Sequence, residues 1–340
     1  MVNIAIIGAG YIGKIHASVL RQFSDRASVS AVFDSLPDKG RALAEEIGAD
    51  AFDDVSSMLH SDDIDAVAVC SPTVSHETYV SLAAERGKHV FCEKPLAQSL
   101  DEADRMIQIV RRNGVQAMSG HVLRFWPVYV RTREIIQSGD LGKPLHGYCE
   151  RLLSLPDWQE GGWHLRQKDG RAAAFDVQIH DLDYLTWLFG RPCTVQSAGL
   201  FDAARGGWIH MNSRVEYEGG QTGYVQAGWA FPAQYPFTMT IRVLCEEGAV
   251  EWNFKAGKLL ETRDRDVPLM VYRKDGSCGE EEIDPGDPFT HQWEYFLDCI
   301  EERRDIERAT FQEGKTALEL ALASIESAKE GKAVSFNEIR

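Results

Sequence analysis

A glycine-rich turn near the start of the chain constrains the fold more than any other feature. The apolar run 3–7 is followed at once by Gly8-Ala9-Gly10-Tyr11-Ile12-Gly13, after which apolar residues recur at helical spacing. A second apolar run, 29–33, ends in Asp34. A dinucleotide-binding βαβ unit places an acid about 20 residues after its last glycine, which is the position of Asp34. This order of strand, turn, helix and acid predicts a dinucleotide site.

Each glycine of this turn has a separate physical task. Gly8 permits the tight turn, Gly10 lets the backbone approach the pyrophosphate, and Gly13 lets the helix pack against the strand. Two other interpretations stay open. The turn could be a structural glycine turn without a ligand, and Asp34 could cap the helix that Pro37 starts.

Length and composition restrict the class of protein. A chain of 340 residues exceeds the size at which one core usually keeps growing, so we expect two domains. A net charge of −16 argues against a nucleic-acid partner, and no apolar run is long enough to span a bilayer. No signal-like segment precedes the first strand, and the 7 cysteines show neither CxxC pairs nor zinc-like spacing. We therefore expect reduced thiols and a cytoplasmic protein.

Strand-like and helical segments alternate in the first part of the chain. This alternation with short connections predicts a parallel, doubly wound sheet of the Rossmann type over residues 1–122. Further strands are expected at 64–70, 89–92 and 116–118, and helices at 37–47, 76–86 and 100–113.

Ligands of such a sheet lie beyond the carboxyl ends of its strands, so segments far apart in the sequence should share one crevice. Lys94 is a charged residue in the turn after one of these strands, which favours a function, although an exposed surface lysine is the alternative. The expected crevice segments are 8–13, Asp34, 71–73, 93–95 and 120–121.

The pattern changes near Pro127. A helix at 127–138 precedes a strand-like run at 145–155 and a loop rich in tryptophan and glycine at 157–164. We expect residues 123–340 to form an α+β domain with a large, mostly antiparallel open sheet. Its further strands are expected at 195–201, 212–217, 222–231, 238–244 and 249–254, and its last helices at 290–303 and 313–329.

One helix of this second half, 175–189, carries acid and imidazole groups. Asp176 and His180 stand four residues apart and so lie on one face, with Asp183 one turn beyond. The structural alternatives are an aspartate that favours the helix dipole and a histidine satisfied in an interface. A metal site on these three side chains is geometrically possible, but no further ligand motif supports it, and we expect no metal.

The motifs together resemble those of the glucose–fructose oxidoreductase, inositol dehydrogenase and rhizopine-catabolism (Gfo/Idh/MocA) family of nicotinamide-dependent oxidoreductases. The resemblance covers essentially the whole chain, and Glu-Lys-Pro at 93–95 is its most specific part. It implies the two-domain architecture described above and a catalytic set of Lys94, Asp176 and His180 facing the nicotinamide. The segments that carry it are 8–17, 71–73 with His76, 87–97, Arg124-Phe125, and Asp176 with His180.

The chain departs from the family at two positions near the expected pocket. Members commonly have a small residue at Gln178 and an asparagine near His121, so both departures bear on the substrate rather than on the reaction. Trp158, Trp163 and His164 are expected to line the sugar side, because aromatic faces suit the C–H faces of a pyranose or cyclitol. Packing across the domain junction is the alternative for these three.

The expected cofactor is NAD rather than NADP. The Asp34 carboxylate can accept from ribose hydroxyls but repels a 2′-phosphate. No arginine follows immediately, the nearest cations being Lys39 and Arg41. The predicted cofactor-binding residues are Gly8, Gly10, Tyr11, Ile12, Gly13, Asp34, Ser71, Thr73, His76, Glu93, Lys94 and Arg124.

These residues predict a dehydrogenase that transfers hydride between nicotinamide and a secondary hydroxyl of a sugar, sugar acid or inositol. His180 would accept the hydroxyl proton, Lys94 would stabilise the developing alkoxide, and Asp176 would orient the imidazole or share in proton transfer. Two alternatives from other classes are a non-catalytic nicotinamide-sensing regulator and an NAD-assisted glycoside-cleaving enzyme.

We also expect a homodimer or homotetramer built on the sheet of the second domain. An antiparallel sheet that helices cover on one face leaves its other face to be covered by a partner. The alternating apolar residues Val225, Ala227 and Trp229, with Ile241 and Val243, are the candidates for that uncovered face.

Overall fold

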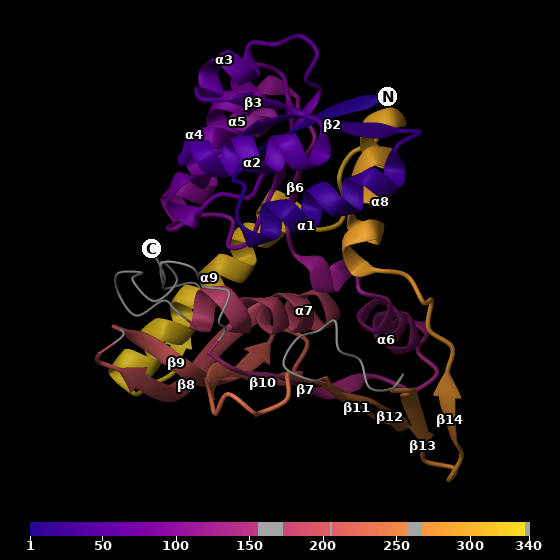
Figure 1. Ribbon diagram of the computed structural model, residues 1–340. Helices are drawn as coiled ribbons and strands as arrows, with labels where there is room; N and C mark the ends of the chain where they lie inside the picture. Colours follow the sequence, from indigo (N-terminus) through magenta and orange to yellow (C-terminus); the bar gives the residue numbers. More distant parts are fainter. Residues whose placement is uncertain (156–172, 205, 257–266, 337–340) are drawn as a thin grey trace. The chain divides into compact units, whose positions relative to one another are not determined.

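The structure is a computed structural model that describes residues 1–155, 173–204, 206–256 and 267–336. Packing divides the chain into two compact units. The first consists of Met1–Phe125 and Gly286–Thr316, and the second of Trp126–Pro285 and Ala317–Arg340. Figure 1 labels the helices and many of the strands of both units.

A parallel sheet of six strands forms the centre of the first unit. The strand order is β3-β2-β1-β4-β5-β6, and every neighbouring pair is parallel. The order reverses between β1 and β4, which is where such sheets bind dinucleotides. The predicted Rossmann-type fold is therefore confirmed. Its strands are β1 (Val2–Ile7), β2 (Ala27–Phe33), β3 (Asp50–Phe52), β4 (Ala66–Val69), β5 (His89–Cys92) and β6 (Ala117–Ser119).

Helix α5 of this unit has side-chain capping at its start and a glycine at its end. α5 starts after Ser99, whose hydroxyl accepts the N–H of Glu102, and it ends at Gly114 in the left-handed conformation. The helices are α1 (Tyr11–Leu20), α2 (Pro37–Ile47), α3 (Val55–Leu59), α4 (His76–Glu85), α5 (Leu100–Asn113) and α8 (Pro288–Glu301), with short 3₁₀ turns η1 (Arg21–Phe23), η2 (Thr73–Ser75) and η3 (Val122–Phe125).

Helix α8 belongs to the first unit although it lies far along the chain. Its residues Trp293 and Phe296 are fully buried, and the Trp293 ring stacks on Phe91 of β5 with centroids 4.9 Å apart. From the sequence this segment was expected in the second domain. The apolar face of α8 is instead buried against α1 and the parallel sheet, so residues 286–316 pack with the first unit.

The second unit contains a mixed sheet of nine strands in the order β14-β13-β12-β11-β7-β10-β9-β8-β15. β7 and β10 pair in parallel, and the other neighbouring pairs are antiparallel. The predicted mostly antiparallel sheet is therefore confirmed. Its strands are β7 (Pro144–Ser154), β8 (Pro192–Asp202), β9 (Gly207–Tyr217), β10 (Thr222–Phe231), β11 (Thr238–Cys245), β12 (Gly248–Lys255), β13 (Leu269–Arg273), β14 (Cys278–Glu281) and β15 (Val334–Ser335).

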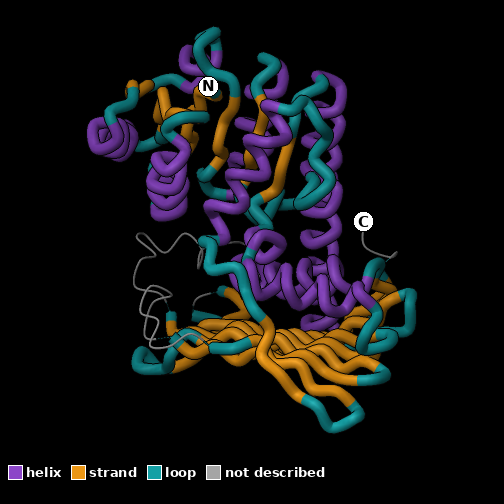
Figure 2. The backbone as a smooth tube through the Cα atoms, turned by 90° about the vertical axis from the view of Figure 1, so that its right-hand side faces the viewer, coloured by secondary structure: helices purple, strands orange, loops and turns teal. Residues whose placement is uncertain are grey.

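Helices lie along one face of this sheet (Figure 2). They are α6 (Pro127–Ser138), the π-helical turn η5 (Ala174–Gln178), α7 (Ile179–Phe189) and α9 (Phe311–Glu330), which begins in the first unit and continues in the second. The π turn is a difference from the regular helix expected over 175–189. Such turns have i→i+5 hydrogen bonds and are frequent at functional sites.

The face of the sheet expected to be open is the face that the helices cover. A Cβ on Gly223 would lie 3.0 Å from Leu185 of α7, so the alternate residues of β10 from Gly223 onward face α7. The apolar residues proposed for an exposed face are all buried, so that assignment was wrong: Val225, Ala227, Trp229, Ile241 and Val243. The opposite face is mostly polar, with exposed Tyr224 and Leu244 among its side chains.

Among the described residues, no helix has the length and apolar character needed to span a bilayer.

Candidate functional site

The turn between β1 and α1 has two glycines at which a Cβ would clash with the backbone. Gly8 has φ of +106°, and a Cβ there would lie 2.7 Å from the backbone of Cys70 and Ser71. A Cβ on Gly13 would lie 2.0 Å from the carbonyl oxygen of Gly8. The turn thus packs tightly against both its own helix and the end of β4.

Gly10 of the same turn has the opposite environment. It is the residue that caps α1, no side chain caps this helix end, and a Cβ on Gly10 would meet no atom within 4 Å. The amino end of α1 therefore has open space in front of it. A helix N-terminus with close backbone access suits a phosphate group, so the turn fits the pyrophosphate of a dinucleotide.

Asp34 connects this turn to the loop after β2. Its Oδ2 accepts the N–H of Ala9 at 2.7 Å, and its Oδ1 accepts the N–H of Leu36 at 2.8 Å. Each carboxylate oxygen keeps a second lone pair that a ribose hydroxyl could use. Leu36 is the capping residue of α2, and no side chain caps that helix. The alternative in which Asp34 caps α2 is therefore wrong.

His76, at the start of α4, connects the loops after β4 and β5. The imidazole is buried, with Nε2 2.9 Å from the carbonyl oxygen of Ser71 and Nδ1 3.1 Å from that of Pro95. Burial lowers the pKa of His76, and the nearby backbone carbonyls offset only part of this effect. His76 was predicted to contact the cofactor, and in the structure its ring nitrogens contact the protein backbone. The predicted Thr73 is also buried, and Ser71 Oγ lies 2.8 Å from Ser75 Oγ.

Glu93 is buried in the turn after β5 and both of its oxygens have protein partners. Oε1 lies 2.9 Å from His16 Nε2, and Oε2 accepts the N–H of Lys94 at 3.0 Å. Burial raises the pKa of Glu93, but the hydrogen bonds with His16 and Lys94 outweigh it and the pKa falls below its usual value. Gly120 lies against this carboxyl group, because a Cβ there would be 2.9 Å from Glu93 Cδ. Both oxygens of Glu93 are thus engaged within the first unit, and its direct contact with the cofactor stays a prediction.

Lys94 itself is half-buried and follows a strand that neighbours β4, which in turn neighbours β1. The first unit thus brings the predicted glycine turn, Asp34, Ser71 and the Glu93-Lys94 turn to the carboxyl edge of one sheet. His16, the partner of Glu93, was not predicted as a site residue, although it lies within the segment 8–17 that carries the family resemblance.

Arg124 and His121 lie in or next to η3 of the first unit. Arg124 is buried and forms an ion pair with Glu313, whose carboxylate also accepts the N–H of Thr310. The guanidinium predicted to contact the cofactor is therefore engaged by a carboxylate of its own unit. His121 is likewise buried.

Asp176 and His180 belong to the second unit, and both are half-buried. Asp176 lies in the π turn η5 and His180 in the first turn of α7. Among the described residues, which include Asp176, His180 and Asp183, no group of three or more His, Cys, Asp or Glu side chains is placed to hold a metal ion.

A buried ion pair next to His180 was not expected from the sequence. Arg151 of β7 binds Asp181 of α7 through two contacts, Nε to Oδ2 at 2.9 Å and Nη2 to Oδ1 at 3.0 Å. Burial alone would lower the pKa of Arg151, but the adjoining Asp181 carboxylate raises it above its usual value. The pair fixes the start of α7, and hence His180, to the sheet.

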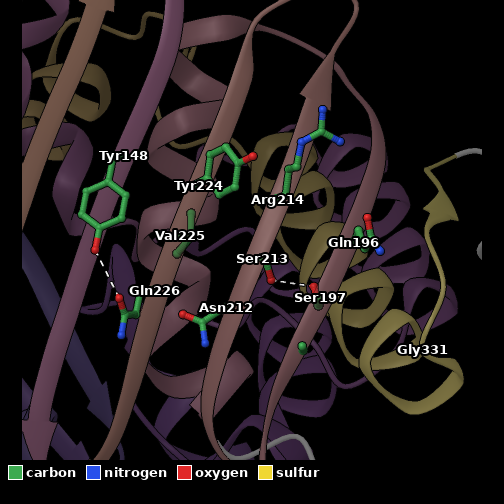
Figure 3. A pocket seen from close by; sticks show the side chains of 11 residues that line it. Tyr148, Gln196, Ser197, Asn212, Ser213, Arg214, Tyr224, Val225, Gln226 and Gly331 are labelled. Carbon is green, nitrogen blue, oxygen red and sulfur yellow. Dashed lines mark hydrogen bonds between the residues drawn. The ribbon is translucent and has the colours of Figure 1, made fainter.

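The predicted substrate residue Gln178 points into the sheet instead of toward open space. It is fully buried, and its Nε2 donates to Ser213 Oγ at 2.9 Å. Ser213 and Ser197 are hydrogen-bonded in Figure 3. Figure 3 also shows a hollow on this sheet, lined by polar side chains such as Tyr148, Arg214 and Gln226, but by none of the predicted site residues. Trp158, Trp163 and His164 lie outside the described residues.

Two family models match the chain. The model described as "Oxidoreductase family, NAD-binding Rossmann fold" matches residues 2–121, and the GFO/IDH/MocA C-terminal domain matches residues 129–251. The matched regions lie mainly in the first and second units, respectively.

Individual proteins are similar over part of the chain. A 2,7-anhydro-N-acetylneuraminate hydratase of Mediterraneibacter gnavus is 34% identical over 194 residues, covering 56% of this chain and 50% of that protein. A myo-inositol 2-dehydrogenase of Thermotoga maritima is 33% identical over 189 residues, covering 55% of each protein. The matches thus span about half the length of these relatives.

A solved structure is similar over nearly the full length. An oxidoreductase from Agrobacterium radiobacter, in complex with NAD⁺, L-tartaric acid and magnesium, has a TM-score of 0.86 and 17% sequence identity. The match covers 99% of this chain and 98% of that one. At this identity the match establishes a shared fold.

Proposed function

We propose that this chain, which belongs to the Gfo/Idh/MocA oxidoreductase family, is an NAD-dependent dehydrogenase of a secondary hydroxyl in a sugar, sugar acid or inositol. The observation that carries the proposal is the carboxyl edge of the six-stranded sheet. There a turn with space for a pyrophosphate, the Asp34 carboxylate and Lys94 follow β1, β2 and β5 of the same sheet. The similarity to a myo-inositol 2-dehydrogenase supports a polyhydroxylated substrate.

The surroundings of Asp34 support NAD over NADP. A 2′-phosphate would meet this carboxylate and would need a cation to compensate. Arg41, the nearest arginine after Asp34, is paired with Asp38 at 3.0 Å and with Asp53 at 2.7 Å. Its charge is therefore already balanced by two carboxylates.

The bound nicotinamide supplies the acceptor for the two electrons that leave the carbinol carbon. In the proposal Lys94 stabilises the negative charge that develops on the substrate oxygen, and His180 accepts the hydroxyl proton. Asp176 orients the imidazole or shares in the proton transfer. Gly8, Gly10 and Gly13 shape the turn that holds the pyrophosphate, and Asp34 binds the ribose hydroxyls.

A second candidate is an enzyme that uses bound NAD without net oxidation of its substrate. NAD-assisted glycoside cleavage is a reaction of this class. The similarity to a 2,7-anhydro-N-acetylneuraminate hydratase favours keeping it. Both candidates use the same nucleotide site, and they differ in whether NADH accumulates.

One experiment separates the candidates. Polyols, aldoses, sugar acids and anhydro sugars are incubated with the protein and either NAD or NADP, and both absorbance at the NADH band and product mass are recorded. Accumulation of NADH with an oxidised product supports the dehydrogenase. A product of unchanged oxidation state without NADH supports the second candidate, and faster turnover with NADP contradicts the cofactor assignment.

We further propose a homodimer or homotetramer that uses the open face of the nine-stranded sheet, and the cytoplasm as its compartment. Exposed Leu200, Tyr224 and Leu244 belong to strands of that sheet, and an uncovered sheet face with such side chains favours association. The 7 cysteines are free thiols, which suits a reducing compartment.

A further inference from the structure

A chain of hydrogen bonds within the first unit runs from α8 to the backbone of Lys94. Trp293 Nε1–H donates to His16 Nδ1 at 2.9 Å, and His16 Nε2 lies 2.9 Å from Glu93 Oε1. The other oxygen of Glu93 accepts the N–H of Lys94 at 3.0 Å. Helices α1 and α8, which are far apart in the sequence, therefore both reach the turn that carries Lys94.

The chemistry of the donors sets the direction of this chain. An indole N–H can only donate, so His16 Nδ1 must present its lone pair to Trp293. The ring proton of His16 therefore lies on Nε2 and is donated to Glu93. Trp293 in this way selects the tautomer of a histidine that holds the carboxylate.

Burial holds the three side chains in place. Trp293 and His16 are fully buried and Glu93 is 6% exposed. The His16 ring meets Phe91 and Phe289 edge to face, with centroids 4.9 Å and 5.6 Å apart. A buried carboxylate is stable only with hydrogen-bond donors, and here His16 and the Lys94 N–H provide them.

We propose that Trp293, His16 and Glu93 are positioning residues for Lys94. The carboxylate fixes the main chain from which the lysine side chain extends, and α8 fixes the carboxylate through the imidazole. The inference rests on the proposed function, in which Lys94 acts on the substrate oxygen. Loss of any member should lower turnover more than cofactor affinity, because the chain ends at Lys94 and not at the glycine turn.

The first test replaces one hydrogen-bonding group of the chain at a time and keeps an aromatic ring or a side chain of similar size. Trp293→Phe removes the indole N–H but keeps an aromatic ring. Glu93→Gln replaces one carboxylate oxygen by an amide NH₂. This NH₂ faces either His16 Nε2–H or the Lys94 N–H, and because both of these are donors, one hydrogen bond is lost in either orientation. Each variant should lower kcat by about 10-fold or more, since a 1 Å misplacement can cost about 100-fold. The KM for NAD should change far less.

The matched control is Phe296→Leu. Phe296 is a fully buried aromatic residue of the same helix, and its centroid lies 6.2 Å from that of Phe91, but it donates no hydrogen bond to the chain. The control should lower the melting temperature while kcat stays near the wild-type value. If the control lost as much kcat as Trp293→Phe at a similar melting temperature, packing alone would explain the effect and the proposal would be overturned.

A second readout needs no substrate. Hydrogen exchange is followed by mass spectrometry in a peptide that covers residues 92–97, which contains the Lys94 amide. Exchange should be faster in Trp293→Phe and Glu93→Gln, and unchanged in the control. Unchanged exchange in both variants overturns the positioning chain, whether or not a substrate is known. If exchange rises but kcat is unchanged, Lys94 does not depend on the chain and the proposal also fails. Absence of NADH formation by the wild-type protein on every sugar would instead count against the proposed dehydrogenase.

Discussion

At the scale of single residues, Gly8 and Gly10 stand two positions apart and have opposite environments. Gly10→Ala places a methyl group in open space, so the fold should lose at most about 1 kcal/mol of stability from a poorer helix cap. The same methyl group would occupy space expected for the pyrophosphate, which should cost about 1–3 kcal/mol of NAD affinity, or about 5-fold to 160-fold.

Gly8→Ala is the comparison for this prediction. Its Cβ would clash with backbone atoms at 2.7 Å, and its φ of +106° is unfavourable for alanine. The main effect of this variant should therefore be a lower melting temperature. Calorimetric titration with NAD, together with thermal melts, distinguishes the two effects. If Gly10→Ala kept wild-type NAD affinity, the turn would not approach the pyrophosphate.

The catalytic assignments are also residue-scale predictions. Lys94→Ala and His180→Ala should each lower turnover by about 100-fold or more, the scale of lost acid–base or oxyanion assistance. NAD affinity should change much less. If Asp176 and His180 only stabilise their helix, their alanine variants should have lower melting temperatures, but the folded variants should keep near-normal turnover. Turnover, NAD affinity and melting temperature measured on Lys94→Ala, Asp176→Ala and His180→Ala decide between these outcomes.

At the scale of secondary-structure elements, His76 joins the start of α4 to the loops that follow β4 and β5. Burial holds the pKa of His76 below its ordinary 6.5 in the folded protein. Above pH 6.5 both the folded and the unfolded chain have neutral imidazole and the stability contribution is complete. As the pH falls below 6.5, the unfolded chain binds a proton that the folded chain resists, so stability decreases.

The expected result is a melting temperature that falls by several degrees between pH 7.5 and 5.5, with a smaller fall in His76→Gln. Burial also lowers the pKa of His89, His146 and His210, so part of the dependence should remain in that variant. His60→Gln, at an exposed position, serves as the control. A His76→Gln variant with the same pH dependence as the wild type would remove His76 from this explanation.

At the scale of the whole molecule, the open face of the nine-stranded sheet predicts association between copies of the chain. Light scattering at micromolar concentration should give the mass of a dimer or tetramer. Tyr224→Glu places a charge on an exposed residue of that face and should shift the mass toward the monomer, because a buried unpaired charge is unfavourable at an interface. Tyr11→Glu, exposed in the first unit, is a control for the added charge. A monomeric wild-type protein contradicts this prediction.

The sequence alone was sufficient for features that depend on nearby residues. The glycine turn, the acid after the second strand and the Ser99 cap were all readable, because turn geometry, helix capping and apolar periodicity are set within a few residues. The Rossmann-type unit follows from repeating these local units with short connections. The Glu93-Lys94 turn was recognisable as a motif, although the partners of Glu93 were not.

The tertiary structure decided the features that join distant segments. Trp293 lies 277 positions from His16, and no local rule connects them. The alternating pattern identified the apolar residues of β10 and β11. It could not determine whether helices cover that face, because alternation divides a strand into two faces and contains no information about which elements pack on each face. No local rule predicts the buried pair of Arg151 and Asp181 either, because the packing of α7 on the sheet brings the two residues together. Burial and hydrogen-bond satisfaction are properties of packing, and packing is set by residues far apart in the sequence.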